Sequence, residues 1–304
     1  MKLKNVVAIK TLSAAVVAGI FILSSCSKSS DNPLTSTDTQ NVNSESVADN
    51  SINETSDMTN SAAASVTNTQ YATGRIDGVI SAVAAKRDGR LAGATITITP
   101  GAGSTKDNPN GTITIDFGAA PGITTDGVTR IGKIIVTYAG KKGVAQSYRS
   151  IGYSGYSRNG IAFDDAMTFT NTNITDSTVF HHVLALGKLT FPDNSTLTRI
   201  ADHYATVDYS ALTLSLSATP NTTSSASGTT RGGKSYSMTI TKPLVYKLAC
   251  VLTKVIIPVS GTKTIIVDSK NSYTIDYGDG TCDNTFTVSL NGKVVTASAT
   301  GDGH

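Results

Sequence analysis

Aliphatic and hydroxyl side chains alternate strictly in short segments of this 304-residue chain, most clearly in Thr95–Thr99 and Leu212–Leu216. Because successive residues of a strand point to opposite faces, this alternation predicts antiparallel strands with one apolar and one solvated face. Glutamate, a good helix former, occurs only at Glu45 and Glu54. Its absence after residue 70 further favours strands over helices there.

Strand patterns recur from residue 94 almost to the end of the chain. Asn291-Gly292 and Gly232-Gly233 lie between such patterns and predict hairpins, because the central residues of tight hairpin turns need positive φ. Since no helical pattern separates the strands, we expect an all-β, mostly antiparallel domain over residues 91–304, either an extended single sheet or a sandwich. The expected strands are Ala94–Thr99, Thr112–Phe117, Lys133–Tyr138, Met167–Thr170, Val183–Phe191, Leu212–Ala218, Tyr236–Thr241, Val255–Val259, Thr264–Val267, Ser272–Tyr277, Thr285–Leu290 and Lys293–Ser298.

At most one short helix is expected, in the linker of residues 70–90 that precedes the strands. Ile76, Val79, Ile80 and Val83 recur at helical spacing and predict a helix over Asp77–Lys86.

The first 25 residues have the features of a signal peptide. A basic segment with Lys2, Lys4 and Lys10 precedes the apolar run Thr11–Leu23, which is too short to span a bilayer. The run ends in Leu23-Ser24-Ser25-Cys26, which resembles the lipobox of bacterial lipoproteins.

The lipobox resemblance implies cleavage before Cys26 and attachment of lipid to its thiol, so the membrane is an expected partner through a lipid anchor. Serine at position 27, by resemblance to the sorting rule of Gram-negative lipoproteins, implies the outer membrane. Both the periplasmic and the surface-exposed face remain open.

Residues 26–69 are rich in Ser, Thr, Asn and Asp and show no sustained apolar period. Such a composition does not bury enough apolar area to offset the entropy of ordering, so we expect a disordered tether. A flexible chain of this length spans roughly 35–40 Å on average.

The net charge of +3 arises from the signal peptide. The remaining 22 basic residues equal the 22 acidic residues in number, and the basic ones are not clustered. The charge balance therefore gives no reason to expect a nucleic-acid partner.

Two segments recur at an offset of 160 residues. Thr112–Gly118 matches Ser272–Gly278, and Gly132–Ile135 matches Gly292–Val295 in the same register. We interpret these matches as a duplicated three-strand unit, with modules at about residues 92–140 and 250–300.

If Cys26 is lipidated, Cys250 and Cys282 remain as an even pair in an oxidising compartment. A disulfide between them is the default expectation, with two buried thiols as the alternative. The segments 228–237 and 275–284, with Pro243-Leu244 between them, resemble an uncharacterised family of Bacteroidetes-type lipoproteins. This resemblance implies no particular activity.

Oxygen ligands gather in the loop that carries Asp276, Asp279, Asp283 and Asn284. Calcium prefers such ligands, but glycine occupies positions 278 and 280 and the bidentate glutamate of an EF-hand is missing. Aspartates that bond their own turn are the favoured alternative, so no cofactor is expected.

The histidines have no zinc-ligand spacing, because the neighbours His181 and His182 point to opposite faces of a strand. No nucleophile elbow is present; Gly152–Gly155 comes nearest and is better explained as a glycine- and tyrosine-rich loop. We therefore expect no catalytic residues and no enzyme, with a hydrolase as a minor alternative.

The expected function is that of a lipid-anchored cell-envelope protein with a structural or binding role, whose partner is a glycan or an envelope protein. A glycan-binding surface module is the main alternative. Its candidate ligand-binding residues are tyrosines near one Gly/Ser-rich loop, whose rings would stack on sugars, although tyrosines that face a sheet surface or the core edge are the favoured interpretation. They are Tyr138, Tyr148, Tyr153 and Tyr156.

Overall fold

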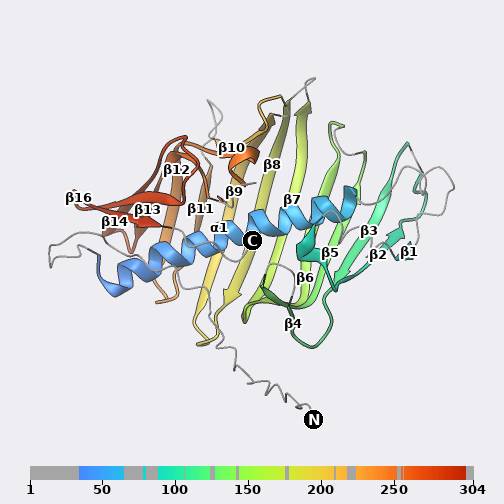
Figure 1. Cartoon of the computed structure of the whole chain (residues 1–304), viewed down its shortest axis with the longest axis horizontal. Helices are drawn as coiled ribbons and strands as arrows, with labels where there is room; N and C mark the ends of the chain where they lie inside the picture. Colours follow the sequence, from blue (N-terminus) through green and yellow to red (C-terminus); the bar gives the residue numbers. More distant parts are fainter. Residues whose placement is uncertain are drawn as a thin grey trace, which may run out of the picture.

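In the computed structural model the strands form one continuous 16-stranded sheet, and a long helix, α1 (Ser36–Ala64), crosses one face of it (Figure 1). The structure describes residues 34–64, 78–79 and 88–298, except for short gaps at 106, 124–126, 142–143, 175–177, 209, 218–223, 252–254 and 256. The predicted signal peptide and Cys26 lie outside the described residues. No described helix is both long and apolar enough to cross a bilayer.

The sheet is a meander in which nearly every strand pairs with its neighbours in sequence, always antiparallel. The predicted all-β, antiparallel fold is therefore confirmed, and the described strands form an extended single sheet. The strands are β1 (Gly78–Val79), β2 (Thr95–Pro100), β3 (Asn110–Asp116), β4 (Gly122–Ile123), β5 (Thr129–Ala139), β6 (Tyr148–Arg158), β7 (Ile161–Ile174), β8 (Thr178–Thr190), β9 (Thr196–Asp208), β10 (Thr213–Ser217), β11 (Ser225–Thr229), β12 (Ser235–Lys247), β13 (Ser260–Val267), β14 (Asn271–Asp279), β15 (Thr285–Leu290) and β16 (Lys293–Ser298).

Strands β10 and β11 together fill one position between β9 and β12. Ser217 of β10 pairs with Tyr204 of β9, and Ser225 of β11 pairs with Asp202, two residues further along the same strand.

The two faces of the sheet have opposite chemistry. The inner face, which α1 covers, carries a rank of buried apolar side chains that are paired from strand to strand. The side chains of this rank are smallest at the centre of the sheet, where three alanines leave room for α1. In order across the sheet the rank is Ile98, Ile113, Val136, Ile151, Met167, Ala185, Ala201, Ala226, Met238, Ile265, Tyr273 and Leu290. The outer face carries the alternating hydroxyl residues, as the sequence pattern predicts.

The disordered tether is the main wrong prediction. Residues 36–64, most of that segment, form α1, which packs against the inner face. The predicted helix Asp77–Lys86 is also wrong at Gly78–Val79, which form β1 and pair with β2. The other residues of that segment lie outside the described part of the chain.

Most predicted strands are confirmed, with a few differences. The described residues of the predicted strand 255–259 are irregular and follow the short helix α4 (Leu248–Val251). The sequence does not predict the two-residue strand β4, nor strands β6, β9 and β11, whose hydroxyl, glycine or charged residues obscure the alternation. Both predicted hairpins are confirmed, and Asn291 and Gly292 have φ of 52° and 79°.

The repeat is retained locally but not as a three-strand unit. Asp116 and Asp276 each accept a hydrogen bond of 2.9 Å from the backbone N–H of the glycine two residues later, and those glycines have φ of 86° and 87°. In the first module β5 pairs directly with β3, whereas in the second β15 lies between β14 and β16. In the first module β5 therefore occupies the position beside β3 that β15 occupies beside β14 in the second.

Candidate functional site: the helix-covered inner face

Helix α1 begins with a cap that the sequence carries in Thr35-Ser36-Thr37-Asp38. The backbone N–H of Thr35 donates to Asp38 Oδ2 at 2.8 Å, and that of Asp38 donates to the Thr35 hydroxyl at 3.2 Å. This reciprocal pair satisfies donors that the first helical turn leaves without a partner.

The buried stripe of α1 has helical spacing but is mostly polar. Hydropathy analysis therefore does not detect it, although the burial repeats every three or four residues. The buried residues of the stripe are Asp38, Asn41, Val42, Ser44, Glu45, Ala48, Ser51, Glu54, Thr55, Met58, Thr59 and Ala62.

The first charged cluster joins the middle of α1 to β9 and β13. Arg199 Nη2 donates to Glu45 Oε1 at 3.0 Å and also to Asp49 Oδ1. The Lys263 ammonium group donates to the other oxygen of Asp49. Arg199 is 5% exposed and Lys263 fully buried, so this is a desolvated network of two acids and two bases.

The environment of this cluster separates the pKa values of its two acids. Burial raises the pKa of Glu45, and Arg199 opposes this without reversing it. Burial also acts on Asp49, but the nearby Lys263 and Arg199 outweigh it and hold the pKa of Asp49 well below its usual range. Asp49 is therefore the anion to which the two bases are chiefly paired.

His203 of β9 lies in the same cluster. Its burial, together with the positive charge of Arg199, lowers its pKa to about 4, although Asp49 acts in the opposite direction. The imidazole is consequently neutral at pH 7, where a second buried cation beside Arg199 would be unfavourable.

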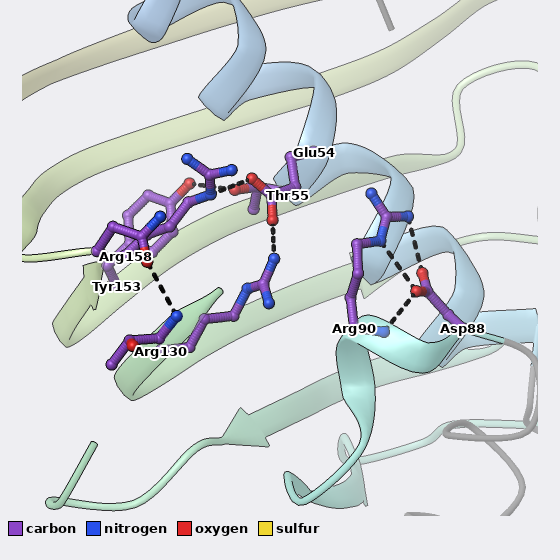
Figure 2. Close-up of polar contacts among 9 residues, drawn as sticks. Glu54, Thr55, Asp88, Arg90, Arg130, Tyr153 and Arg158 are labelled. Carbon is purple, nitrogen blue, oxygen red and sulfur yellow. Dashed lines mark hydrogen bonds and ion pairs between the residues drawn. The ribbon is translucent and has the colours of Figure 1, made fainter. Parts of the chain in front are cut away.

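The second cluster holds the C-terminal half of α1 on β5 and β6 (Figure 2). Glu54 Oε1 accepts from Arg130, and Glu54 Oε2 lies 2.6 Å from Arg158 Nε. Beside them the Tyr153 hydroxyl donates to Thr55 Oγ1 at 3.0 Å. Both glutamates of the chain thus serve to fix α1 to arginines of the sheet.

Further polar contacts extend along the helix in both directions. The Tyr273 hydroxyl of β14 donates to Asp38, whose pKa is lowered because this bond and those from Thr35 outweigh burial. Near the other end Arg149 of β6 donates to Asn60 and, at 2.8 Å, to the Ser56 hydroxyl. Beyond α1, Asp88 caps the 3-10 helix η1 (Gly89–Leu91) and binds the Arg90 side chain at 2.8 Å (Figure 2).

A small cavity of about 20 Å³ lies between α1 and strands β8 and β9. Its lining includes Ile52, Leu189 and Arg199. The volume is about that required for one buried water molecule. The inner face is therefore filled by α1 and side chains in this region.

The four candidate tyrosines do not form one surface. Tyr156 is 1% exposed and stacks on Tyr153 at a centroid distance of 5.3 Å, and both rings contact Phe163 in the core beneath α1. Tyr138 packs against the same core, whereas Tyr148 is 41% exposed. The interpretation of these residues as a shared sugar platform is wrong for all but Tyr148.

Cys250 and Cys282 form a disulfide, as predicted, with a Cα–Cα distance of 5.1 Å. The aspartates of the neighbouring loop bond their own turns: Asp279 accepts from Thr281 and Asp283 from Thr285, each hydroxyl at 2.7 Å. This confirms the turn interpretation. Among the described residues no group of three or more His, Cys, Asp or Glu side chains is arranged to hold a metal ion.

The histidines reveal a second feature, on the outer face. His182 Nε2 of β8 lies 2.7 Å from Asp202 Oδ1 of β9, and the His182 ring stacks on Tyr204 at 5.0 Å. Tyr148, Thr170, His182 and Tyr204 are paired across four successive strands and so form one row, here called the aromatic row.

No family model matches the chain, and no curated protein and no solved structure matches it significantly. The site is therefore described by its own chemistry. The sequence signals that could have located it are the cap at Thr35 and the spacing of Glu45, Asp49 and Glu54 among buried small residues.

Proposed function

We propose that this chain is a lipid-anchored protein of the cell envelope with a binding role, and that the outer face of the sheet is its binding surface. The anchor rests on the lipobox at Cys26 and on the signal peptide before it. Outer-membrane localisation rests on the serine at position 27, by resemblance to the sorting rule of Gram-negative lipoproteins.

The observation that carries the binding role is a row of hydroxyl side chains across the outer face, here called the hydroxyl row. Its members pair strand to strand, and Leu184 and Asp202 interrupt it at β8 and β9. Its hydroxyl residues are Thr99, Thr112, Thr137, Ser150, Thr168, Ser225, Thr239, Thr264, Thr274 and Ser289. Each hydroxyl both donates and accepts, and adjacent strands repeat at about 4.8 Å.

A glycan is the ligand class that these features favour. The aromatic row adjoins the hydroxyl row, with Asp202 of the latter bonded to His182 of the former. Tyr148 and Tyr204 lie three strand spacings apart, which is roughly 14 Å. Tyr148 is exposed and Tyr204 half-buried, and their rings offer apolar faces for sugar rings, while the hydroxyls and Asp202 offer hydrogen-bond partners.

A binding assay on glycan arrays and insoluble cell-wall polysaccharides tests this proposal. Tyr204→Ala and Tyr148→Ala should each weaken binding about tenfold, which corresponds to ~1.4 kcal/mol for a lost stacking contact. Ile266→Thr on β13 is the matched control, because Ile266 is also exposed but lies outside the aromatic row. Binding that is equal in all variants, or absent in the wild type, would contradict the glycan proposal.

The anchor needs a separate experiment. Cys26→Ala should move the protein from the membrane fraction to the soluble fraction and abolish incorporation of labelled fatty acid. Retention of the variant in membranes with unchanged labelling would contradict the lipid anchor and leave the glycan result unaffected.

A further inference from the structure

We propose that the inner face of the sheet is a docking surface for an acidic amphipathic helix of another protein, and that α1 is its displaceable intramolecular occupant. This proposal does not depend on the glycan proposal, which concerns the opposite face. Four observations lead to it: the weak helix propensity of α1, the basic groups beneath it, the incomplete pairing of Arg199 and the way α1 is connected.

Helix α1 has little tendency to form by itself. Most of its residues are Ser, Thr, Asn or Asp, which compete with helical hydrogen bonds and lower helix propensity. The Ser44, Ser46 and Ser51 hydroxyls bond back to backbone carbonyls four residues earlier, which stabilises no tertiary contact. Docking on the sheet therefore supplies most of the helical stability, and an undocked α1 would be a flexible chain.

The inner face presents basic groups to whatever covers it. They come from four strands, and each is paired with a carboxylate or another polar group of α1; Arg149 also lies 4.2 Å over the Phe169 ring of β7. They are Arg130, Arg149, Arg158, Arg199 and Lys263. Buried cations need compensating anions, so an occupant of this face must be acidic as well as partly apolar.

Helix α1 pairs the central arginine incompletely. A single nitrogen, Nη2 of Arg199, serves both Glu45 and Asp49, while Nε and Nη1 have no hydrogen-bond partner among the described residues. The small cavity borders the same guanidinium group. A helix that places a carboxylate in the bidentate geometry arginine prefers would bind more strongly than α1 at this point.

The connectivity of α1 permits exchange. The contacts of α1 with the strands described above are made by side chains, so its departure leaves the strand ladders intact. Thirteen residues, 65–77, join α1 to β1, which is itself paired with β2, so α1 is covalently tied to the sheet only through this connection and the described strands can stay paired when it leaves.

The test is titration of a fluorescein-labelled peptide of residues 34–64 with the detergent-purified full chain, followed by fluorescence anisotropy. Glu45→Gln/Asp49→Asn weakens α1 in the protein and should increase peptide affinity at least about tenfold over wild type, because the competing helix is lost. The same two substitutions in the peptide should weaken its binding by a similar factor. Thr37→Ser, an exposed position at the start of α1, is the matched control and should leave affinity at the wild-type value.

Each outcome of the titration either supports or overturns the docking surface. Tighter binding to the double variant, lost with the substituted peptide, supports the docking surface. No binding to the double variant while circular dichroism shows an intact sheet overturns it, as does equal binding of both peptides. A concentration-dependent dimer of the double variant without added peptide would assign the face to α1 of a second copy and overturn a separate partner.

Discussion

Two parts of the inner face are held together by different forces. Within the sheet, an apolar rank runs unbroken from Ile98 to Leu290, and backbone ladders join every strand. Between the sheet and α1, the strongest contacts are buried ion pairs centred on Arg199, Lys263 and Glu54. The buried apolar area of this rank stabilises the sheet, whereas the docking of α1 depends on a few buried ion pairs. Removing one charge should therefore release α1 and leave the sheet folded.

The largest effect is expected at Arg199. Arg199→Met leaves Glu45 and Asp49 buried without their shared cation, which costs about 3–5 kcal/mol. Amide hydrogen exchange should show rapid exchange throughout α1 and unchanged protection in β5–β8. Arg231→Met is the matched control, because the Arg231–Asp193 pair is near the surface and contributes at most about 1 kcal/mol. Equal loss of protection in α1 and the strands would contradict the separation of forces.

Loss of the disulfide should affect the sheet rather than α1. Cys250→Ser/Cys282→Ser opens a loop whose ends are 32 residues apart and removes about 3–4 kcal/mol in the chain-entropy model. Thermal unfolding should shift to lower temperature, and hydrogen exchange should increase around β12–β15 while α1 stays protected near Glu54. A melting temperature equal to that of wild type would show that the bridge does not stabilise this end.

His203 should make the helix interface sensitive to acid. Its pKa is lowered from about 6.5 to about 4 in the folded state, so the unfolded chain binds the proton first as pH falls. The stability that the neutral imidazole contributes is fully present above pH 6.5 and is lost as pH falls towards 4. Between pH 7 and 4.5 the wild type should lose about 2–3 kcal/mol more than His203→Gln in urea unfolding.

The control for this pH experiment is His182→Gln, because His182 lies on the outer face beside exposed Asp202. That variant should retain the pH dependence of the wild type. If His203→Gln retains it as well, the titration of His203 does not explain the acid sensitivity.

The smallest effect is expected at the turn between β15 and β16. Asn291 has a φ of 52°, and Asn291→Ala should cost about 1 kcal/mol because alanine is strained there. Faster hydrogen exchange confined to β15 and β16 would support a local hairpin, and a loss that extends to α1 would show that the two regions are coupled.

The difference between the sheet and α1 also explains which elements can be predicted from the sequence. Thr95–Thr99 forms a strand because its alternation is local, and Asn291-Gly292 forms a turn for the same reason. Helix α1 depends on partners far away in sequence, such as Arg199, which is 154 residues from Glu45 and 150 from Asp49. The composition of residues 36–64 reflects how this segment would behave away from the sheet. It therefore predicts a disordered tether where the structure has helix α1. The disulfide was predictable by elimination, whereas the aromatic row depends on strand register.

The position of α1 also sets how far the sheet stands from a bilayer if Cys26 carries the lipid. With α1 docked, nine residues separate Cys26 from the helix start, an extended reach of about 30 Å and an average span nearer 15–18 Å. Asp38 bonds Tyr273, so the end of the sheet near β14 would point towards the headgroups. With α1 undocked, the whole segment between Cys26 and β1 would act as one long linker. One helix would thus set both the height and the tilt of the protein above its membrane.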